Sequence, residues 1–279
     1  MNVATEKIFS PDSLDAALDL LGQYGPDLFV IAGGTLAMQL INEGMISPKV
    51  AMTLHRAQLN EVRAVNGHFE IGATTTLTRV TQLSEVPLLA EAARHVGGWA
   101  IRNVATLAGN LFVPPPAGDA AVALLALDAE VIAANKGSVR KIPLDQFFTG
   151  LMETALAPGE LVTQINVPRP QGKTAFVKFG RRQANTPAVV TVAAHIVQDD
   201  QGICQEARIA LGAAGDYPLR ARQAEAALRG RKLDAQSITA AAEAASQEVQ
   251  PFSDAIASGW YRRKMVGVYV RRALEAIGG

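Results

Sequence analysis

Two glycine-centred segments carry the residue types that could hold an anionic ligand. The first, LFVIAGGTLAMQ (residues 28–39), passes from small and apolar residues into Gly33-Gly34-Thr35 and then into a helical pattern. Glycine lets a backbone come close to a ligand, because no Cβ stands in the way. Thr35 stands where a helix N-cap is expected, so free N–H groups would point outward and favour a phosphate. A tight turn without any ligand is an equally good interpretation of this segment taken alone.

The second segment, ATLAGNLFVPPPAGDAAVALLALD (residues 105–128), has the same character. Asn110 can both donate and accept hydrogen bonds, and Asp119 follows it by nine residues, at the start of an apolar helix. Asp119 is therefore either a helix N-cap or an acceptor for the hydroxyls or ring of a ligand. Neither GxGxxG nor GxxxxGK occurs in the chain, which excludes the standard nucleotide loops. A diphosphate held between two separate turns remains open.

Composition excludes several other kinds of site. Lys and Arg number 26 and so do Asp and Glu, and this zero net charge argues against nonspecific binding of nucleic acid. Cys204 is the only cysteine, so a disulfide within the chain or an iron–sulfur cluster held by this chain is excluded. The four histidines lack metal-ligand spacing and are interpreted as structural: His55, His68, His95 and His195.

The chain has the size and the apolar content of a two-domain protein, with 279 residues of which 49% are hydrophobic. Its longest apolar runs fall short of the roughly 20 residues that span a membrane. The first 21 residues lack a charged segment followed by an apolar stretch, so no secretion signal is expected. The sequence therefore predicts a cytoplasmic protein with no metal of its own.

The elements around the two segments predict an α+β protein. Asn66-Gly67 marks a hairpin within residues 60–77, and residues 130–144 predict a second one. No parallel strand is expected at the usual spacing after the first strand, and residues 48–54 are predicted as a separate strand. Residues 100–119 are too rich in small residues and proline to be helix or strand throughout. The helices expected here are 10–25, 36–44, 78–97 with a break before Pro87, and 119–129, and the strands are 28–32 and one that ends at Pro168.

Residues 169–173 are the candidate domain boundary, since the pattern changes beyond them. Three alternating stretches predict antiparallel strands, and three helical stretches follow. In the last helix, the basic runs Tyr261-Arg262-Arg263-Lys264 and Arg271-Arg272 are interpreted as an exposed face, with docking onto another subunit as the second interpretation. The strands are 174–183, 187–198 and 203–215, and the helices are 220–230, 234–249 and 258–277.

AGGT (residues 32–35), then IRNVATLAGN (residues 101–110), then Asp119 resembles the FAD-binding medium subunit of the molybdenum hydroxylases. Carbon-monoxide dehydrogenase and xanthine dehydrogenase belong to this family. The resemblance covers nearly the whole chain and implies a vanillyl-alcohol-oxidase-like (PCMH-type) FAD-binding domain over residues 1–170. That domain would have two subdomains, of about residues 1–55 and 56–170. Residues 171–279 would form a C-terminal α+β domain with a three-stranded antiparallel sheet and helices.

The resemblance also implies the contacts with FAD. Lys178 falls beside the flavin ring, Val162 makes an apolar contact, and Asp119 contacts the ADP or ribityl part. In its own context, followed by Arg181 and Arg182, Lys178 also fits a solvated face. The residues implied to line the diphosphate are Phe29, Val30, Ile31, Ala32, Gly33, Gly34, Thr35 and Leu36 on one side, and Thr106, Ala108, Gly109 and Asn110 on the other.

Two departures from the family pattern bear on the second segment. Ala108 stands where the family has the first glycine of Gly-Gly-Asn, and FVPPPAGD (residues 112–119) replaces a more polar loop. Alanine keeps the turn if its φ is negative, so binding of FAD is still expected.

The function implied is that of an electron-transfer flavoprotein subunit with no catalytic residue of its own. FAD would accept electrons from the clusters of a 2Fe-2S small subunit, after chemistry at a molybdopterin-binding large subunit, and pass them to an external acceptor. The expected assembly is a heterotrimer, paired into a dimer of heterotrimers. One alternative is a self-contained flavin oxidase, which would need an acid or base beside the flavin, although neither motif contains a histidine. Another is a scaffold without cofactor.

Overall fold

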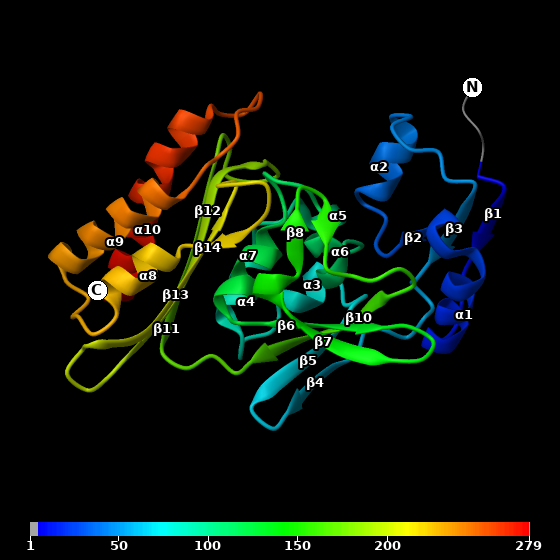
Figure 1. Ribbon diagram of the computed structural model, residues 1–279, viewed down its shortest axis with the longest axis horizontal. Coiled ribbons are helices and arrows are strands. Elements are labelled where there is room, and N and C mark those ends of the chain that lie inside the picture. The colour runs from blue at the N-terminus through cyan, green and yellow to red at the C-terminus, as the bar shows by residue number, and fades with distance from the viewer. Residues whose placement is uncertain (1–4, 279) are drawn as a thin grey trace.

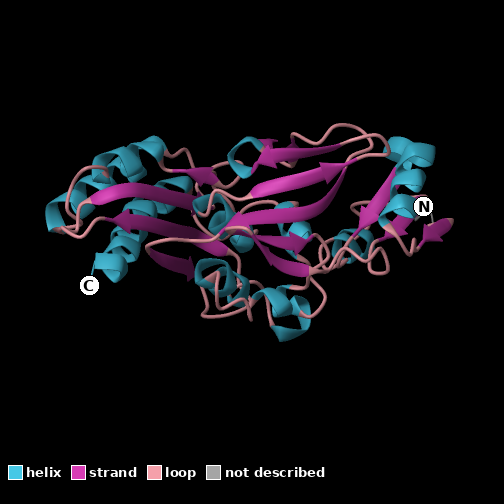
Figure 2. Ribbon diagram, turned by 90° about the horizontal axis from the view of Figure 1, so that it is seen from below, coloured by secondary structure: helices cyan, strands magenta, loops and turns pink. Residues whose placement is uncertain are grey.

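The computed structural model describes residues 5–278 as three packed units in a row (Figure 1). Seen from below, the strands form the long middle of the molecule, with helices gathered at both ends and along one side (Figure 2). Within residues 5–278, no helix combines the length and the apolar character that crossing a membrane requires.

The first unit is a parallel three-stranded sheet of order β1-β3-β2. The prediction that no parallel strand follows the first strand is wrong, since β3 pairs in parallel with β2. Residues 32–49 make the crossover, and the helix within them reverses the chain direction as parallel pairing requires. The elements are β1 (Lys7–Phe9), α1 (Leu14–Tyr24), β2 (Leu28–Ile31), α2 (Ala37–Asn42) and β3 (Val50–Thr53).

The second unit is built on an antiparallel sheet of order β4-β5-β10-β6-β7. Both predicted hairpins are confirmed, as β4–β5 and as β6–β7. Asn66 and Gly67 adopt positive φ angles of 30° and 87°, the conformation that a tight turn between twisted strands needs. The strands are β4 (Val62–Val65), β5 (His68–Gly72), β6 (Glu130–Ala134), β7 (Val139–Pro143) and β10 (Leu161–Pro168), and a small separate hairpin consists of β8 (Phe148–Gly150) and β9 (Glu153–Thr154).

Short helices pack with this sheet around an apolar core (Figure 1). Residues 100–119 hold two helices of four and five residues separated by turns, so the prediction that no regular element runs through this segment is confirmed. The break predicted before Pro87 within 78–97 is confirmed: residues 81–86 form turns, and Pro87 opens the second of two helices. The helices of this unit are α3 (Leu77–Val80), α4 (Pro87–Arg94), α5 (Trp99–Arg102), α6 (Leu107–Leu111) and α7 (Asp119–Ala126).

The third unit is an antiparallel sheet of order β11-β12-β13-β14, covered on its outer face by three helices (Figure 1). The three predicted strands are the long ones. The sheet also has a fourth strand, of two residues, too short to give a periodic sequence signal. The elements are β11 (Lys173–Gly180), β12 (Ala188–Gln198), β13 (Cys204–Gly212), β14 (Leu219–Arg220), α8 (Arg222–Leu228), α9 (Ala235–Glu248) and α10 (Gly259–Gly278).

Helix α7 joins the second and third units. All of its residues are buried. It packs against β12 and β13, and two residues of that sheet, Ala193 and Ala210, belong to the same apolar core as α7. The C-terminal sheet therefore has helices on both faces.

The basic run on α10 does not form a uniformly exposed face. Arg263 and Lys264 are exposed, but Arg262 is fully buried, so the exposed-face interpretation is wrong for this residue. Helix periodicity turns neighbouring positions by about 100°, which places one arginine of the pair against the sheet and the other in solvent.

Candidate functional site

The two glycine turns lie against each other. A Cβ added to Gly33 would lie 2.1 Å from the carbonyl oxygen of Val104, so the backbones meet where Gly33 lacks a side chain. The Cβ position of Gly109 lies 3.8 Å from the Cβ of Ala32. The fold thus brings together two segments that are about seventy residues apart in the chain. The close approach that Gly33 allows here is to protein backbone, whereas the sequence suggested an approach to phosphate.

The first turn presents unpaired amides. The N–H groups from Gly33 to Leu36 donate to no protein acceptor within residues 5–278. Gly34 has a φ of +73°, and such a left-handed residue in a turn orients successive N–H groups toward a common point. The prediction that Thr35 is the N-cap is wrong: α2 begins at Ala37 with Leu36 in the cap position. The array is therefore a turn of free donors, suited to an anion.

A third segment, which sequence reasoning missed, completes the second turn. The N–H of Leu77 donates to the carbonyl of Ala105 at 2.8 Å, and the N–H of Leu107 donates to the carbonyl of Thr75 at 2.9 Å. Residues 75–77 and 105–107 are thereby paired, and the bridge centres on Thr76. The sequence predicts only a hairpin over residues 60–77.

The repeated Thr-Leu pair could have revealed this partner. Thr76 and Thr106 are the N-caps of α3 and α6, and each side chain accepts the N–H of the residue three positions later. A threonine in this position before an apolar residue is a helix-start signal. Thr106 bonds the N–H of Gly109 at 3.1 Å, so its hydroxyl has a structural role in the turn.

Asn110 is buried, and its side-chain oxygen accepts the N–H of Ala120 at 3.0 Å. Asn110 thus caps α7 from ten residues upstream. We expect Asn110→Ala to lower the free energy of unfolding by about 1 kcal/mol, because one amide at the start of a helix loses its acceptor. Denaturant unfolding checks this, with Asn42→Ala at an exposed position of α2 as the comparison. A loss equal to experimental error would contradict the capping role.

Asp119 does not cap its own helix, so the N-cap interpretation is wrong. Gly118 occupies the cap position with a φ of +88°. The carboxylate of Asp119 accepts hydrogen bonds from Lys178 Nζ at 2.5 Å and from Thr191 Oγ1 at 3.0 Å. Burial raises the pKa of Asp119, and the Lys178 ammonium and the Thr191 hydroxyl oppose that shift. Both carboxylate oxygens therefore hold groups of the C-terminal sheet.

The Lys178 side chain is buried, which makes the solvated-face interpretation wrong. Its ammonium group also donates to the carbonyl of His95 at 3.1 Å. Lys178, on β11 of the third unit, thus bonds to the start of α7 and to the end of α4, which both belong to the second unit. Val162 lies elsewhere: it is buried on β10, in the apolar core of the second unit.

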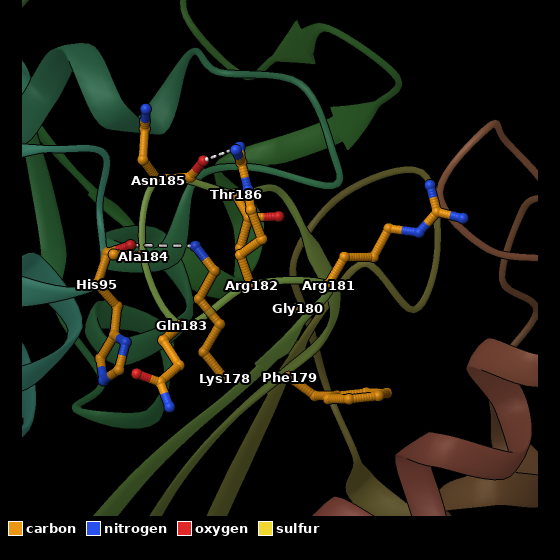
Figure 3. Close-up of a pocket in the computed structure, with 10 residues that line it drawn as sticks. All are labelled: His95, Lys178, Phe179, Gly180, Arg181, Arg182, Gln183, Ala184, Asn185 and Thr186. Carbon is orange, nitrogen blue, oxygen red and sulfur yellow. Dashed lines mark hydrogen bonds between the residues drawn. The ribbon is translucent and has the colours of Figure 1, made fainter.

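A cavity of about 260 Å³ opens beside Lys178, as Figure 3 shows. His95 and Lys178 form one wall, and the rest is formed by the last two residues of β11, Phe179 and Gly180, and by residues 181–186 of the loop that leads to β12. Gln183 lies toward His95 in this view, whereas Phe179 points away from Lys178 (Figure 3). Most of the lining residues are polar or basic, the exceptions being Phe179, Gly180 and Ala184, and none is a carboxylate.

Apolar side chains border the free amides of the first turn. Met38 contacts the Cβ position of Gly34 at 3.6 Å and is 47% exposed, and Val104, next to Gly33, is 52% exposed. Ile101 and Trp99 on α5 are exposed as well. Exposed apolar residues gathered around polar donors are typical of a binding site for a ligand with both characters.

These residues fit FAD. Its diphosphate would match the free amides from Gly33 to Leu36, and its aromatic ends would find the apolar side chains around the turns and the cavity beside Lys178. The lack of a Cβ at Gly33 keeps the two turns close enough to form one site. Among residues 5–278, no group of three or more His, Cys, Asp or Glu side chains could hold a metal ion.

Comparisons with known proteins agree with this geometry. The family model for the FAD binding domain in molybdopterin dehydrogenase matches residues 3–170, and that for the CO dehydrogenase flavoprotein C-terminal domain matches residues 175–277. The 6-hydroxypseudooxynicotine dehydrogenase complex subunit alpha of Paenarthrobacter nicotinovorans is 34% identical, over 94% of this chain and 91% of that protein. The glyceraldehyde dehydrogenase medium chain of Sulfolobus acidocaldarius is 32% identical, over 95% and 96%. Among solved structures, a chain of carbon monoxide dehydrogenase from Hydrogenophaga pseudoflava superposes with a TM-score of 0.93 at 29% identity, covering 99% of this chain and 98% of that one.

Proposed function

Because the chain belongs to the family of FAD-binding subunits of the molybdenum hydroxylases, we propose that it binds FAD across its two glycine turns as the electron-transfer subunit of an oxidoreductase complex. The observation that carries the proposal is the run of free amides from Gly33 to Leu36, set against the second turn. FAD supplies the redox chemistry when bound, and the protein supplies binding and orientation.

The chain's own residues divide the work of holding FAD. Residues 29–36 would line the diphosphate, with hydrogen bonds from the free amides. Residues 106–110 would close the opposite side. The Asp119–Lys178 pair would act at the ring end as one unit, with Lys178 toward the cavity and Asp119 behind it. Val162 would contribute through the packing of β10 under the site.

We also propose the division of the chain into an FAD-binding domain over residues 1–170 and a C-terminal domain over residues 171–279. The separate family matches to residues 3–170 and 175–277 support this division. The proposed partners are a molybdopterin-binding large subunit and a 2Fe-2S small subunit, in a dimer of heterotrimers in the cytoplasm. The names of related subunits as medium chain or complex subunit support such an assembly.

Anaerobic mixing of the FAD-loaded chain with organic substrates tests the subunit proposal. We expect the flavin absorbance to stay unchanged with aldehydes, purines or other N-heterocycles, because in the proposed complex the substrate is oxidised on the large partner subunit and the small partner subunit relays the electrons. A chemical reductant should bleach the band, and adding the two partner subunits should make bleaching depend on substrate. A purified chain that takes up no FAD at all would contradict the binding proposal itself.

A self-contained flavin oxidase is the second candidate, and His95 is the observation that favours it. Sequence reasoning gave that candidate no acid or base, since neither motif contains a histidine. The fold nevertheless brings His95 to the wall of the cavity beside Lys178, with its Nε2 3.2 Å from a carboxylate oxygen of Glu91. Bleaching of the flavin by an organic substrate without any partner would select this candidate over the subunit.

A further inference from the structure

The loop that walls the cavity has little to hold it in place. Residues 181–187 are exposed except for Thr186. Within residues 5–278, the hydrogen bonds of this loop stay inside it: Arg182 donates to the carbonyl of Asn185 at 2.8 Å, and the Thr186 hydroxyl donates to the carbonyl of Pro187 at 3.3 Å. The position of the loop therefore depends on its two stems, the end of β11 and the start of β12.

Arg262 of α10 holds the second stem. Its guanidinium donates to the carbonyls of Ala188 and Val189, at 3.0 and 2.8 Å, and to the carboxylate of Asp254 at 2.7 Å. The ring of Phe252 lies 4.8 Å from the guanidinium carbon. Burying an arginine completely is costly unless its charge is paired, so these contacts must outweigh a large loss of hydration.

The same helix holds the first stem. The ring of Phe179, the last residue but one of β11, stacks on the ring of Tyr269 with centroids 4.8 Å apart and planes 13° apart. Tyr261 packs on the same ring at 6.4 Å. The ring of Phe179 is directed toward α10 and away from Lys178 (Figure 3).

We propose that Arg262 and Tyr269 are positioning residues, through which α10 clamps both stems of loop 181–187 and so fixes the wall of the cavity beside Lys178. The clamp itself does not depend on FAD. Its consequence for the flavin rests on the proposed function, in which the ring lies at this cavity. Arg262 Nε has no partner within residues 5–278. The side chain therefore acts through three hydrogen bonds of its terminal nitrogens and through the contact of its face with Phe252.

Limited trypsin digestion of the FAD-loaded full chain tests the clamp, because Arg181 and Arg182 are exposed cleavage sites at the start of the loop. We expect Arg262→Lys and Tyr269→Leu each to raise the rate of cleavage after these residues at least tenfold. The matched control is Arg271→Lys, an exposed position on the same helix, which should cleave like the unaltered chain. Both lysine variants preserve the number of trypsin sites.

The measurement is made well below the melting temperature and repeated in dilute urea, because cleavage through local opening is insensitive to low denaturant whereas cleavage through global unfolding is not. Unchanged cleavage in folded Arg262→Lys and Tyr269→Leu would overturn the proposal. If the first variant fails to fold, the second decides. Visible circular dichroism of bound FAD gives the separate answer: faster cleavage with an unchanged flavin spectrum supports the clamp and removes the flavin ring from this cavity.

Discussion

Asp119→Ala should lower the free energy of unfolding by about 3–5 kcal/mol, the range for breaking a buried ion pair from one side. The reason is that Lys178 would keep a charged ammonium in a buried place with only the carbonyl of His95 as a partner. The Thr191 hydroxyl would lose its acceptor as well. Denaturant unfolding of the variant without FAD measures the effect.

Asp15→Ala is the matched control, since Asp15 is an exposed acid in the first turn of α1. Its loss should cost no more than about 1 kcal/mol, the size of a helix-dipole effect. The double variant Asp119→Asn, Lys178→Met should lose less than the two single losses combined, because it leaves no unpaired charge. Equal small losses for Asp119→Ala and Asp15→Ala would reduce Asp119 to a helix-end charge.

Repeating this measurement with saturating FAD tests whether Asp119 also contributes to FAD binding. If Asp119 also contacts FAD, as the family resemblance implies, the Asp119→Ala variant should lose more stability when FAD is saturating than when it is absent. If the loss is the same in both conditions, Asp119 adds nothing to the affinity for FAD and only holds Lys178 and Thr191 in the fold. Protein donors already bind both oxygens of the carboxylate, so an extra loss with FAD would come through Lys178 rather than from a direct contact.

Gly33→Ala should weaken the binding of FAD more than about 100-fold, which corresponds to about 2.7 kcal/mol. The added Cβ would lie 2.1 Å from the Val104 carbonyl oxygen and 2.9 Å from Ala105 Cα, so backbone has to move. The two turns would have to separate, and the free amides would no longer lie beside the second turn. Equilibrium titration of the variant with FAD, followed by flavin fluorescence, measures the loss.

Gly98→Ala is the comparison for this prediction. Gly98 immediately precedes α5 and is near Val104 in the sequence, and a Cβ added to it would meet no atom within 4 Å. That variant should bind FAD like the unaltered chain. A Gly33→Ala protein with unchanged affinity would mean that the contact between the turns is not needed for the site.

Sequence patterns predicted the elements whose signals are local. Asn66-Gly67 specifies its turn through backbone conformation alone, and the long strands of the third unit alternate over many residues. The parallel pairing of β3 with β2 escaped prediction because pairing is a property of two segments. The N-terminus of α2 was misplaced at Thr35, because a threonine caps a helix only where the chain continues as helix directly after it.

The site residues also differ in whether a local sequence signal marks them. The glycine turns could be found from residue type, and the family resemblance supplied their common purpose. That Asp119 would meet Lys178, 59 positions later, has no local signal, since neither residue's neighbours require it. Arg262 and Arg263 are adjacent and identical in type, and only the packing of α10 on the sheet decides which one is buried.

The burial of α7 on all sides has a consequence for how the chain can be divided and exchanged. By its place in the sequence, α7 belongs to the FAD-binding half, yet it fills the inner face of the C-terminal sheet. Cutting the chain near residue 170 would expose apolar surface on both products. The boundary seen in the sequence therefore does not separate two independently packed parts of the folded protein. A C-terminal half grafted from a relative would have to match α7 side chain by side chain, and the two halves can therefore change only together.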